Sequence, residues 1–144
     1  MNPSDYLEHA AQHCQTRGAR LTDLRRQVLE LALRATGLVK AYQVLSLMQN
    51  ERGVVAPPTV YRALDFLVEH GLLHRVEALN GYVVCPHFDC PHDSLILVCE
   101  ACGGVNELDT QETFAPVWAA CAAQGFTPRR QDVVLTGRCQ ACAA

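Results

Sequence analysis

The stretch PPTVYRALDFL, Pro57–Leu67, decides the fold of the first half of the chain, because two prolines lead into a helical pattern. Proline suits the first turn of a helix, where a backbone N–H has no intrahelical partner. The apolar residues then recur at the spacing of one buried helix face: Val60, Ala63, Leu64 and Leu67. Gly71 is a natural C-terminal stop, so we predict a helix from Pro57 to about His70 with Phe66 on its exposed side.

Three further helices are predicted upstream of this stretch. Residues 4–17 form the first, which ends at Gly18, and Thr22 caps a second, which ends near Gly37. Residues 41–50 form a third, short helix that Gly53 stops. We expect this third helix to turn four apolar side chains inward: Val44, Leu45, Leu47 and Met48.

Downstream of Gly71 the pattern changes to alternation. Residues 73–77 and 82–84 are predicted to form two strands. Asn80-Gly81 lies between them, and both residues tolerate positive φ, which favours a two-residue hairpin turn. Helices followed by a hairpin is the order of a winged helix-turn-helix, so we expect this DNA-binding fold for residues 1–84.

A second domain is expected after a hinge. Residues 85–93 are rich in Pro, His and Asp, as suits a linker. Residues 95–98, 105–108 and 132–137 are predicted strands, and residues 111–124 a helix. Residues 94–144 therefore form a small α/β domain, and the fold class of the whole chain is α+β.

Two pairs of cysteines indicate a structural metal site. The chain has eight cysteines, and four of them form C-x-x-C pairs, each directly after a predicted strand: Cys99, Cys102, Cys139 and Cys142. Zn²⁺ prefers four tetrahedral ligands and binds thiolates well. The alternative is a redox dithiol, which normally needs one such pair at a helix start.

The remaining single cysteines and histidines have simpler explanations. Cys14 and Cys121 lie on apolar helix faces and are predicted core thiols. His9, His13 and His70 are expected at the surface.

Composition and charge exclude some classes of protein and permit others. No apolar run approaches the ~20 residues of a membrane span, and the N-terminus lacks the pattern of a secretory signal. We therefore expect a soluble, cytoplasmic protein without membrane association. The net charge is -3, but residues 1–80 hold nine Lys/Arg and eight Asp/Glu, so the acidity belongs to the second half. This distribution permits DNA binding by the first half. No catalytic set of residues is apparent, so we do not expect an enzyme.

The combination of a winged helix, a hinge rich in metal-ligand residues and two C-x-x-C pairs resembles the ferric uptake regulator (Fur) family. Within it, the chain is similar to the zinc uptake regulator (Zur) branch. The resemblance covers nearly the whole chain and is most specific in three stretches: Ala41-Tyr42, Pro57–Leu67 and Cys99–Gly103. It implies a homodimer that represses zinc uptake genes when a regulatory metal is bound. It also implies binding to A/T-rich palindromic operator DNA.

The resemblance further implies a regulatory zinc site, so that each chain holds two zinc ions. Matched position by position, its ligands are His74, Cys85, His92 and Glu107. Such a set satisfies tetrahedral Zn²⁺. The linker is one residue shorter than usual in the family, and the alternative ligands are His87 and Cys90.

One departure from the iron-sensing and peroxide-sensing members bears on the metal. Those members carry a His-x-His pair before the first C-x-x-C, whereas this chain has His92-Asp93-Ser94. The thiolate of Cys85 favours zinc over Fe²⁺. The alternatives are a family member that senses iron, manganese or nickel, and a thiol-based redox protein.

The winged helix also predicts which residues read DNA. Arg62 is the expected base contact, because guanidinium pairs bidentately with guanine. Tyr61 and Thr59 are expected phosphate contacts, and the resemblance adds Tyr42. A second group of side chains is expected to position the backbone: Arg20, Arg25 and Arg26.

Overall fold

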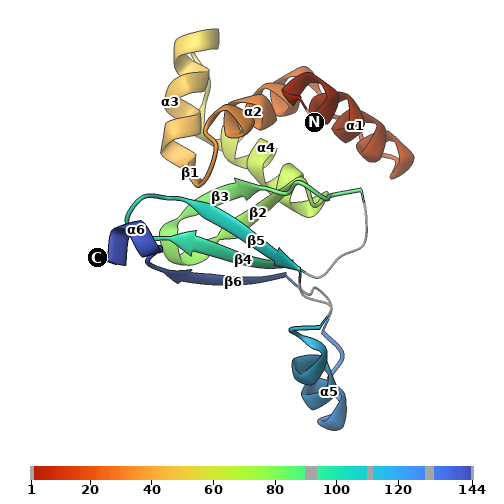
Figure 1. The fold of residues 1–144 in the computed structure, drawn as a ribbon. Helices are drawn as coiled ribbons and strands as arrows, with labels where there is room; N and C mark the ends of the chain where they lie inside the picture. The colour runs from red at the N-terminus through yellow and green to blue at the C-terminus, as the bar shows by residue number, and fades with distance from the viewer. Residues whose placement is uncertain (1, 90–93, 110–111, 129–131, 144) are drawn as a thin grey trace. The chain divides into compact units, whose positions relative to one another are not determined.

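The computed structural model describes residues 2–89, 94–109, 112–128 and 132–143. The chain forms two compact units, residues 1–89 and residues 90–144 (Figure 1). The segment Cys85–Asp89, which sequence analysis assigned to the hinge, packs with the first unit. Within the described segments, no helix has the length and apolar composition needed to cross a membrane.

Four helices build the first unit: α1 (Pro3–Thr16), α2 (Asp23–Arg34), α3 (Ala41–Arg52) and α4 (Pro57–Glu69). The predicted cap of the second helix is present, because the Arg25 backbone N–H donates to the Thr22 hydroxyl at 3.5 Å. The prediction that Pro57 begins the fourth helix is also confirmed. It ends at Glu69 with His70 as its cap, and Gly71 follows with a φ of 74°.

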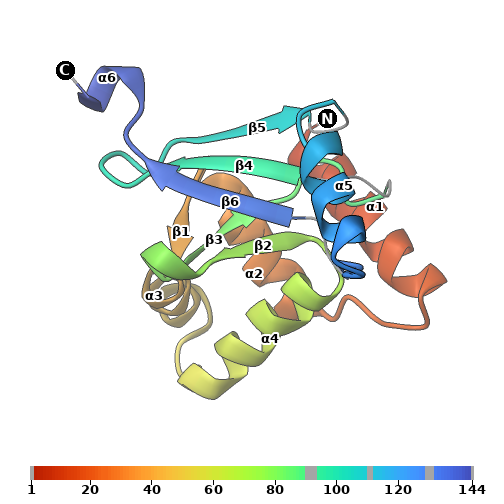
Figure 2. The same cartoon turned by 90° about the horizontal axis from the view of Figure 1, so that it is seen from below.

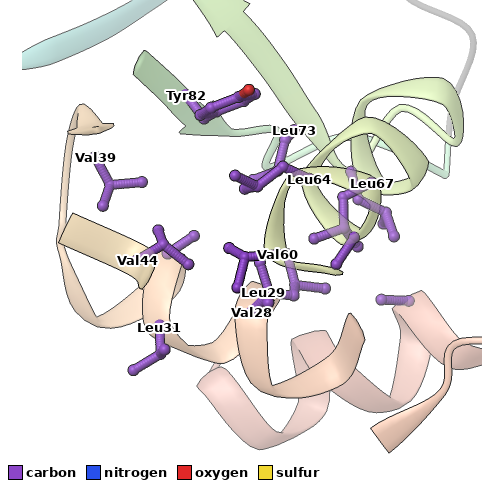
Figure 3. Close-up of a cluster of buried hydrophobic side chains, with 14 of the residues drawn as sticks. Val28, Leu29, Leu31, Val39, Val44, Val60, Leu64, Leu67, Leu73 and Tyr82 are labelled. Atoms are coloured by element: carbon purple, nitrogen blue, oxygen red, sulfur yellow. The ribbon is translucent and has the colours of Figure 1, made fainter. Parts of the chain in front are cut away.

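The core of this unit lies where α2, α3 and α4 converge. Figure 3 shows Val28 and Leu29 of α2 beside Val60 and Leu64 of α4, and both pairs are fully buried. The predicted apolar stripe of α4 is buried throughout. In the third helix, however, the prediction for Leu47 was wrong, since this side chain is 42% exposed.

Phe66 differs from its prediction as well. It is partly buried and packs against the core of the first unit. The Arg25 guanidinium carbon lies 3.7 Å from the centre of its ring, in cation–π geometry. Arg25 also donates to the backbone carbonyl of Arg20 at 2.7 Å. Arg25 therefore has a structural role within the unit, joining α2 to the α4 helix.

A three-stranded sheet completes the first unit. It contains β1 (Val39–Lys40), β2 (Leu73–Val76) and β3 (Gly81–Val84), with β3 in the centre. The predicted hairpin is confirmed, because β2 and β3 pair antiparallel. Its turn is longer than the pair Asn80-Gly81, since a 3₁₀ turn, η1 (Glu77–Leu79), and Asn80 join the two strands. Asn80 is left-handed as predicted, with a φ of 47°, but Gly81 already lies in the strand. A side chain at Gly81 would meet Leu38, whose Cδ1 lies 2.7 Å from the Cβ position, so close approach requires this glycine.

The second unit is a small sheet with two short helices. Its elements are β4 (Ser94–Cys99), β5 (Val105–Asp109), α5 (Ala115–Ala123), β6 (Asp132–Gly137) and α6 (Gln140–Ala143). Figure 2 shows β4 between β5 and β6; β5 pairs antiparallel with β4 and β6 pairs parallel. The parallel pair needs a crossover, and the segment with α5 supplies it. All three predicted strands are confirmed, and the helix is shorter than predicted.

The single cysteines and histidines gave mixed outcomes. Cys14 is fully buried, as predicted, and burial raises the pKa of its thiol. Cys121 is half-buried, and no α5 residue is buried within the chain. His13 and His70 are half-buried rather than fully at the surface, whereas His9 is exposed.

Candidate metal centre and nucleic-acid interface

Four cysteine sulfurs gather at one end of the second sheet. The ligand atoms of Cys99, Cys102, Cys139 and Cys142 all lie within 4.8 Å of one another. Cys102 Sγ and Cys139 Sγ are 3.9 Å apart. Zn–S bonds of ~2.3 Å at tetrahedral angles separate sulfurs by about 3.8 Å. The spacing therefore fits one zinc ion held by four thiolates.

The backbone brings the two C-x-x-C pairs together because β4 and β6 are neighbours. Cys99 ends β4 opposite Gly137, the last residue of β6, in parallel register. The Cys139 backbone N–H donates to Cys99 Sγ at 3.4 Å, and the Gly104 N–H donates to Cys102 Sγ at 3.4 Å. Gly103 has a φ of 72°, a conformation that favours glycine and turns the chain back under the sulfurs. Such N–H donors stabilise thiolate charge.

The thiols have opposite acid–base tendencies. Hydrogen bonds, chiefly from the Cys139 backbone N–H, lower the pKa of Cys99 to about 6. The pKa of Cys142 is raised to about 12, because hydrogen bonds with the thiols of Cys139, Cys99 and Cys102 favour its protonated form. Without a cation, the cluster therefore retains protons that a bound Zn²⁺ must displace.

Two of the predicted regulatory ligands lie together in the first unit. His74 of β2 is opposite Val83, and the Cys85 backbone N–H donates to the Leu72 carbonyl at 3.0 Å. His74 lies within β2, and Cys85 directly follows the last residue of β3. Both are buried, with 5% and 1% of their surface exposed. Histidine nitrogen and cysteine sulfur are both atoms that bind Zn²⁺.

The other two predicted ligands belong to the second unit of the chain. Glu107 lies on β5 of the second unit, opposite Ile96, and is half-buried. His92 and the alternative ligand Cys90 lie outside the described residues. Among the residues that the structure describes, the four cysteines are the only group of three or more potential ligands within reach of one ion.

The predicted DNA-reading residues lie on α3 and α4. Tyr42 is in the first turn of α3 and is 63% exposed, and Tyr61 of α4 is 45% exposed. Arg62 is exposed and Thr59 is half-buried. Because the apolar stripe of α4 is fixed in the core, its polar face is turned outward. An outward polar face on the second helix of a helix-turn-helix is the arrangement that enters a major groove.

Comparison with known proteins identifies the family. Residues 16–136 match the ferric uptake regulator family. The chain belongs to the Fur family. It is 39% identical over 139 residues to the zinc uptake regulation protein of Escherichia coli (strain K12), covering 96% of this chain and 81% of that protein.

Two solved structures of Fur-family proteins are similar over the full length. One is a zinc uptake regulator complexed with zinc and DNA, with a TM-score of 0.89 and 38% identity over 99% of this chain and 96% of that chain. Another is holo XcZur, with a TM-score of 0.83 and 37% identity over 99% of each chain. The α+β fold with a helical first part and a small sheet domain is the fold of this family.

The sequence patterns of this Fur-family chain did not predict the contacts of two aromatic residues. The Tyr6 hydroxyl donates to the Cys85 carbonyl at 2.6 Å, and Phe88 packs on the Tyr6 ring. Helical periodicity placed Tyr6 in the first helix without a partner, and the polar surroundings of Phe88 suggested a linker. The one signal available was an aromatic residue inside a segment rich in Pro, His and Asp.

Proposed function

We propose that this chain is a zinc-responsive transcriptional repressor that binds operator DNA as a homodimer and controls zinc uptake genes. The observation that carries the proposal is its full-length similarity to a zinc uptake regulator complexed with zinc and DNA. The four-cysteine cluster and the outward polar face of α4 are the two parts that this function requires. Because the proposed target is operator DNA, we infer that the protein acts in the cytoplasm.

DNA is read by the first unit. In the proposal Arg62 contacts base edges, since it extends from the outward face of α4 and a guanidinium pairs with guanine. Tyr61, Thr59 and Tyr42 contact phosphates on either side of the groove and position the helix. The expected operator is a palindrome, because a symmetric dimer binds two half-sites. The family resemblance implies that this palindrome is A/T-rich.

Two zinc ions per chain have different tasks. The first is structural and is held by Cys99, Cys102, Cys139 and Cys142. It joins the last residues of the chain to the end of β4, and its binding energy supports the fold of the second unit.

The second zinc is regulatory and is held by His74, Cys85, His92 and Glu107. What supports this set is the burial of both His74 and Cys85 in the first unit, together with a half-buried acid on β5. These ligands belong to different units of the chain. One ion bound by all four would restrain the two units relative to each other, and hence the spacing of two recognition helices in a dimer.

The second unit supplies the dimer interface. Large apolar side chains are exposed on its strands, on α5 and just after α5, namely Leu108, Leu135, Val117 and Phe126. Exposed apolar groups of this kind mark surfaces that a partner covers. A second copy of the chain is the partner that a palindromic operator requires.

The test is a titration of operator binding against buffered free Zn²⁺, repeated with Mn²⁺ and Fe²⁺. We expect operator affinity to rise with Zn²⁺ at lower free concentrations than with either other metal, because a ligand set with a thiolate favours zinc. Metal analysis should give about two zinc ions per chain. A greater response to Mn²⁺ or Fe²⁺ would support a sensor of another metal. Operator binding that depends on reductant instead of metal would support the thiol redox alternative.

A further inference from the structure

The segment that follows the wing is bound to helix α1 through its backbone. The Tyr6 hydroxyl donates to the Cys85 carbonyl at 2.6 Å and lies 3.4 Å from the Leu72 carbonyl. Cys85 in turn donates its N–H to that same Leu72 carbonyl at 3.0 Å. One hydroxyl therefore contacts the residue before β2 and the residue after β3, and the latter is a proposed zinc ligand.

Aromatic packing fixes the segment three residues later. Phe88 is 8% exposed, and its ring meets the Tyr6 ring edge-on, with centroids 5.0 Å apart and planes at 74°. The His13 ring approaches Phe88 in the same way, at 5.1 Å and 75°. Edge-to-face pairs of this geometry are favourable beyond the area that they bury. Phe88 thus packs on α1 between the rings of Tyr6 and His13.

Helix α1 also touches the end of the recognition helix. His13 Nε2 lies 3.0 Å from the carbonyl of His70, the cap residue of α4. The same histidine packs on Phe88. A single helix therefore contacts both the segment of Cys85 and the C-terminal end of α4.

Burial makes the Tyr6 contact costly to lose. Tyr6 is 6% exposed, so its hydroxyl is shielded from water. If the Cys85 carbonyl moved away, this hydroxyl would lose its closest acceptor inside the protein. A buried polar group that loses its partner is destabilising. The segment is held in one position as long as the unit is folded.

Resting on the function proposed above, we propose that Tyr6 and Phe88 are positioning residues for the zinc response. They clamp the segment Cys85–Phe88 to α1, so that a zinc ion bound at Cys85 moves the DNA-binding unit as one body. With a loose segment, the ion would draw Cys85 toward its other ligands without moving the recognition helix. The clamp converts ligation of one sulfur into a displacement of α4.

The experiment measures the zinc–operator coupling factor of the full-length chain. This factor is the ratio of operator dissociation constants with the regulatory site empty and with it saturated by buffered Zn²⁺, the structural zinc being present throughout. The variants are Tyr6→Phe, which removes only the hydroxyl, Phe88→Leu, and the two together. We expect the double variant to lower the coupling factor roughly three- to tenfold, the scale of one hydrogen bond and one aromatic contact.

Two further measurements separate positioning from general damage. Tyr82→Phe removes the hydroxyl of another buried tyrosine in the same unit and should leave the coupling factor unchanged. In the variants, Co²⁺ at the regulatory site should keep its thiolate charge-transfer band, showing that Cys85 still binds metal.

The coupling factor decides the outcome. An unchanged factor in both Tyr6→Phe and the double variant overturns the clamp, as does an equal loss in Tyr82→Phe. If the unaltered chain shows no zinc-dependent gain in operator affinity, the proposed function itself fails. Failure of the proposed function is thus distinguished from failure of the clamp, because it is measured on the unaltered chain.

Discussion

The two proposed sets of metal ligands in this chain differ in how far the fold alone assembles them. The four cysteines come from two turns at the ends of neighbouring strands, and their sulfurs lie within 4.8 Å of one another. The proposed regulatory ligands come from a wing strand, the segment after the wing, and β5 of the other unit. His74 lies in the sheet of the first unit, Cys85 directly follows that sheet, and Glu107 lies in the sheet of the second unit.

This difference predicts different energetics. A set closed by one small unit needs little further ordering, so its metal is held tightly and contributes to folding. A set spread over two units must restrain both when the metal binds, and this entropic cost weakens the affinity. Weak, reversible binding suits a sensor, and tight binding suits a structural site. The following predictions, in descending order of expected effect, test whether the two sets behave in these separate ways.

The largest effect is expected at the structural set. Cys139→Ser removes one thiolate from the proposed structural site. The binding free energy of zinc at such sites is roughly 10–16 kcal/mol, so the second unit should lose both its zinc and its fold. Zinc content, circular dichroism and molecular mass in solution measure this. Cys121→Ser, on α5 and outside the cluster, should change none of them. A Cys139→Ser protein that remains a dimer with full zinc content would contradict the prediction.

The next effect is a loss of regulation without loss of structure. Cys85→Ser or His74→Ala should leave a folded dimer with about one zinc ion per chain. Operator affinity should no longer rise with added zinc, a loss on the order of 1–3 kcal/mol of coupling. Zinc stoichiometry and operator affinity are measured on the same preparation. If Cys85→Ser retains two zinc ions and a normal response, the regulatory site includes other ligands, with Cys90 and His87 the first to examine.

A third effect concerns DNA alone and should leave both metal sets intact. Arg62→Ala should weaken operator binding by roughly 1–3 kcal/mol and binding to random DNA much less, because a base contact discriminates between sequences. Zinc content should stay at the level of the unaltered chain. Arg62→Lys keeps the charge but not the bidentate geometry and serves as the control. Equal losses on both DNAs would make Arg62 a phosphate contact.

The smallest effect is at the cap of α2. Thr22→Ala removes a long hydrogen bond of 3.5 Å to the Arg25 N–H and should lower the free energy of unfolding by about 0.5–1 kcal/mol, the weak end for such caps. Thermal unfolding measures it. The coupling between zinc and operator should not change, which shows that stability of the first unit and regulation are separable. A change in coupling as large as that of Cys85→Ser would refute this separation.

Local signals in the sequence predicted much of this structure. The signals for three of its elements each lie within a few residues of the chain, so the sequence pattern was enough to predict them. They are the helix start at Pro57, the helix cap at Thr22 and the strand Asp132–Gly137. The four cysteines were predictable for the same reason, since each C-x-x-C pair is a local turn. Their meeting then followed from strands that end at the same edge of a sheet.

Features that depend on distant partners were missed. The short strand β1 exists because Val39 pairs with Tyr82, which lies 43 positions further along the chain. Leu47 has an apolar side chain on an exposed helix face, which periodicity cannot distinguish from a buried one. The contact between Tyr6 and Cys85 spans 79 positions and involves a backbone atom, which leaves no trace in residue types.

That last contact has a consequence for how metal preference can change. Tyr6 binds the carbonyl of position 85, and every amino acid presents the same carbonyl. At position 85 the backbone carbonyl holds the chain to Tyr6, whereas the side chain supplies the proposed metal ligand. A change of side chain therefore leaves the hydrogen bond to Tyr6 available. Substituting Cys85 by His or Asp would replace a soft sulfur by nitrogen or oxygen and shift the metals that bind. The tether to α1 would persist, so one scaffold could be retuned for a different metal without rebuilding the helix that anchors it.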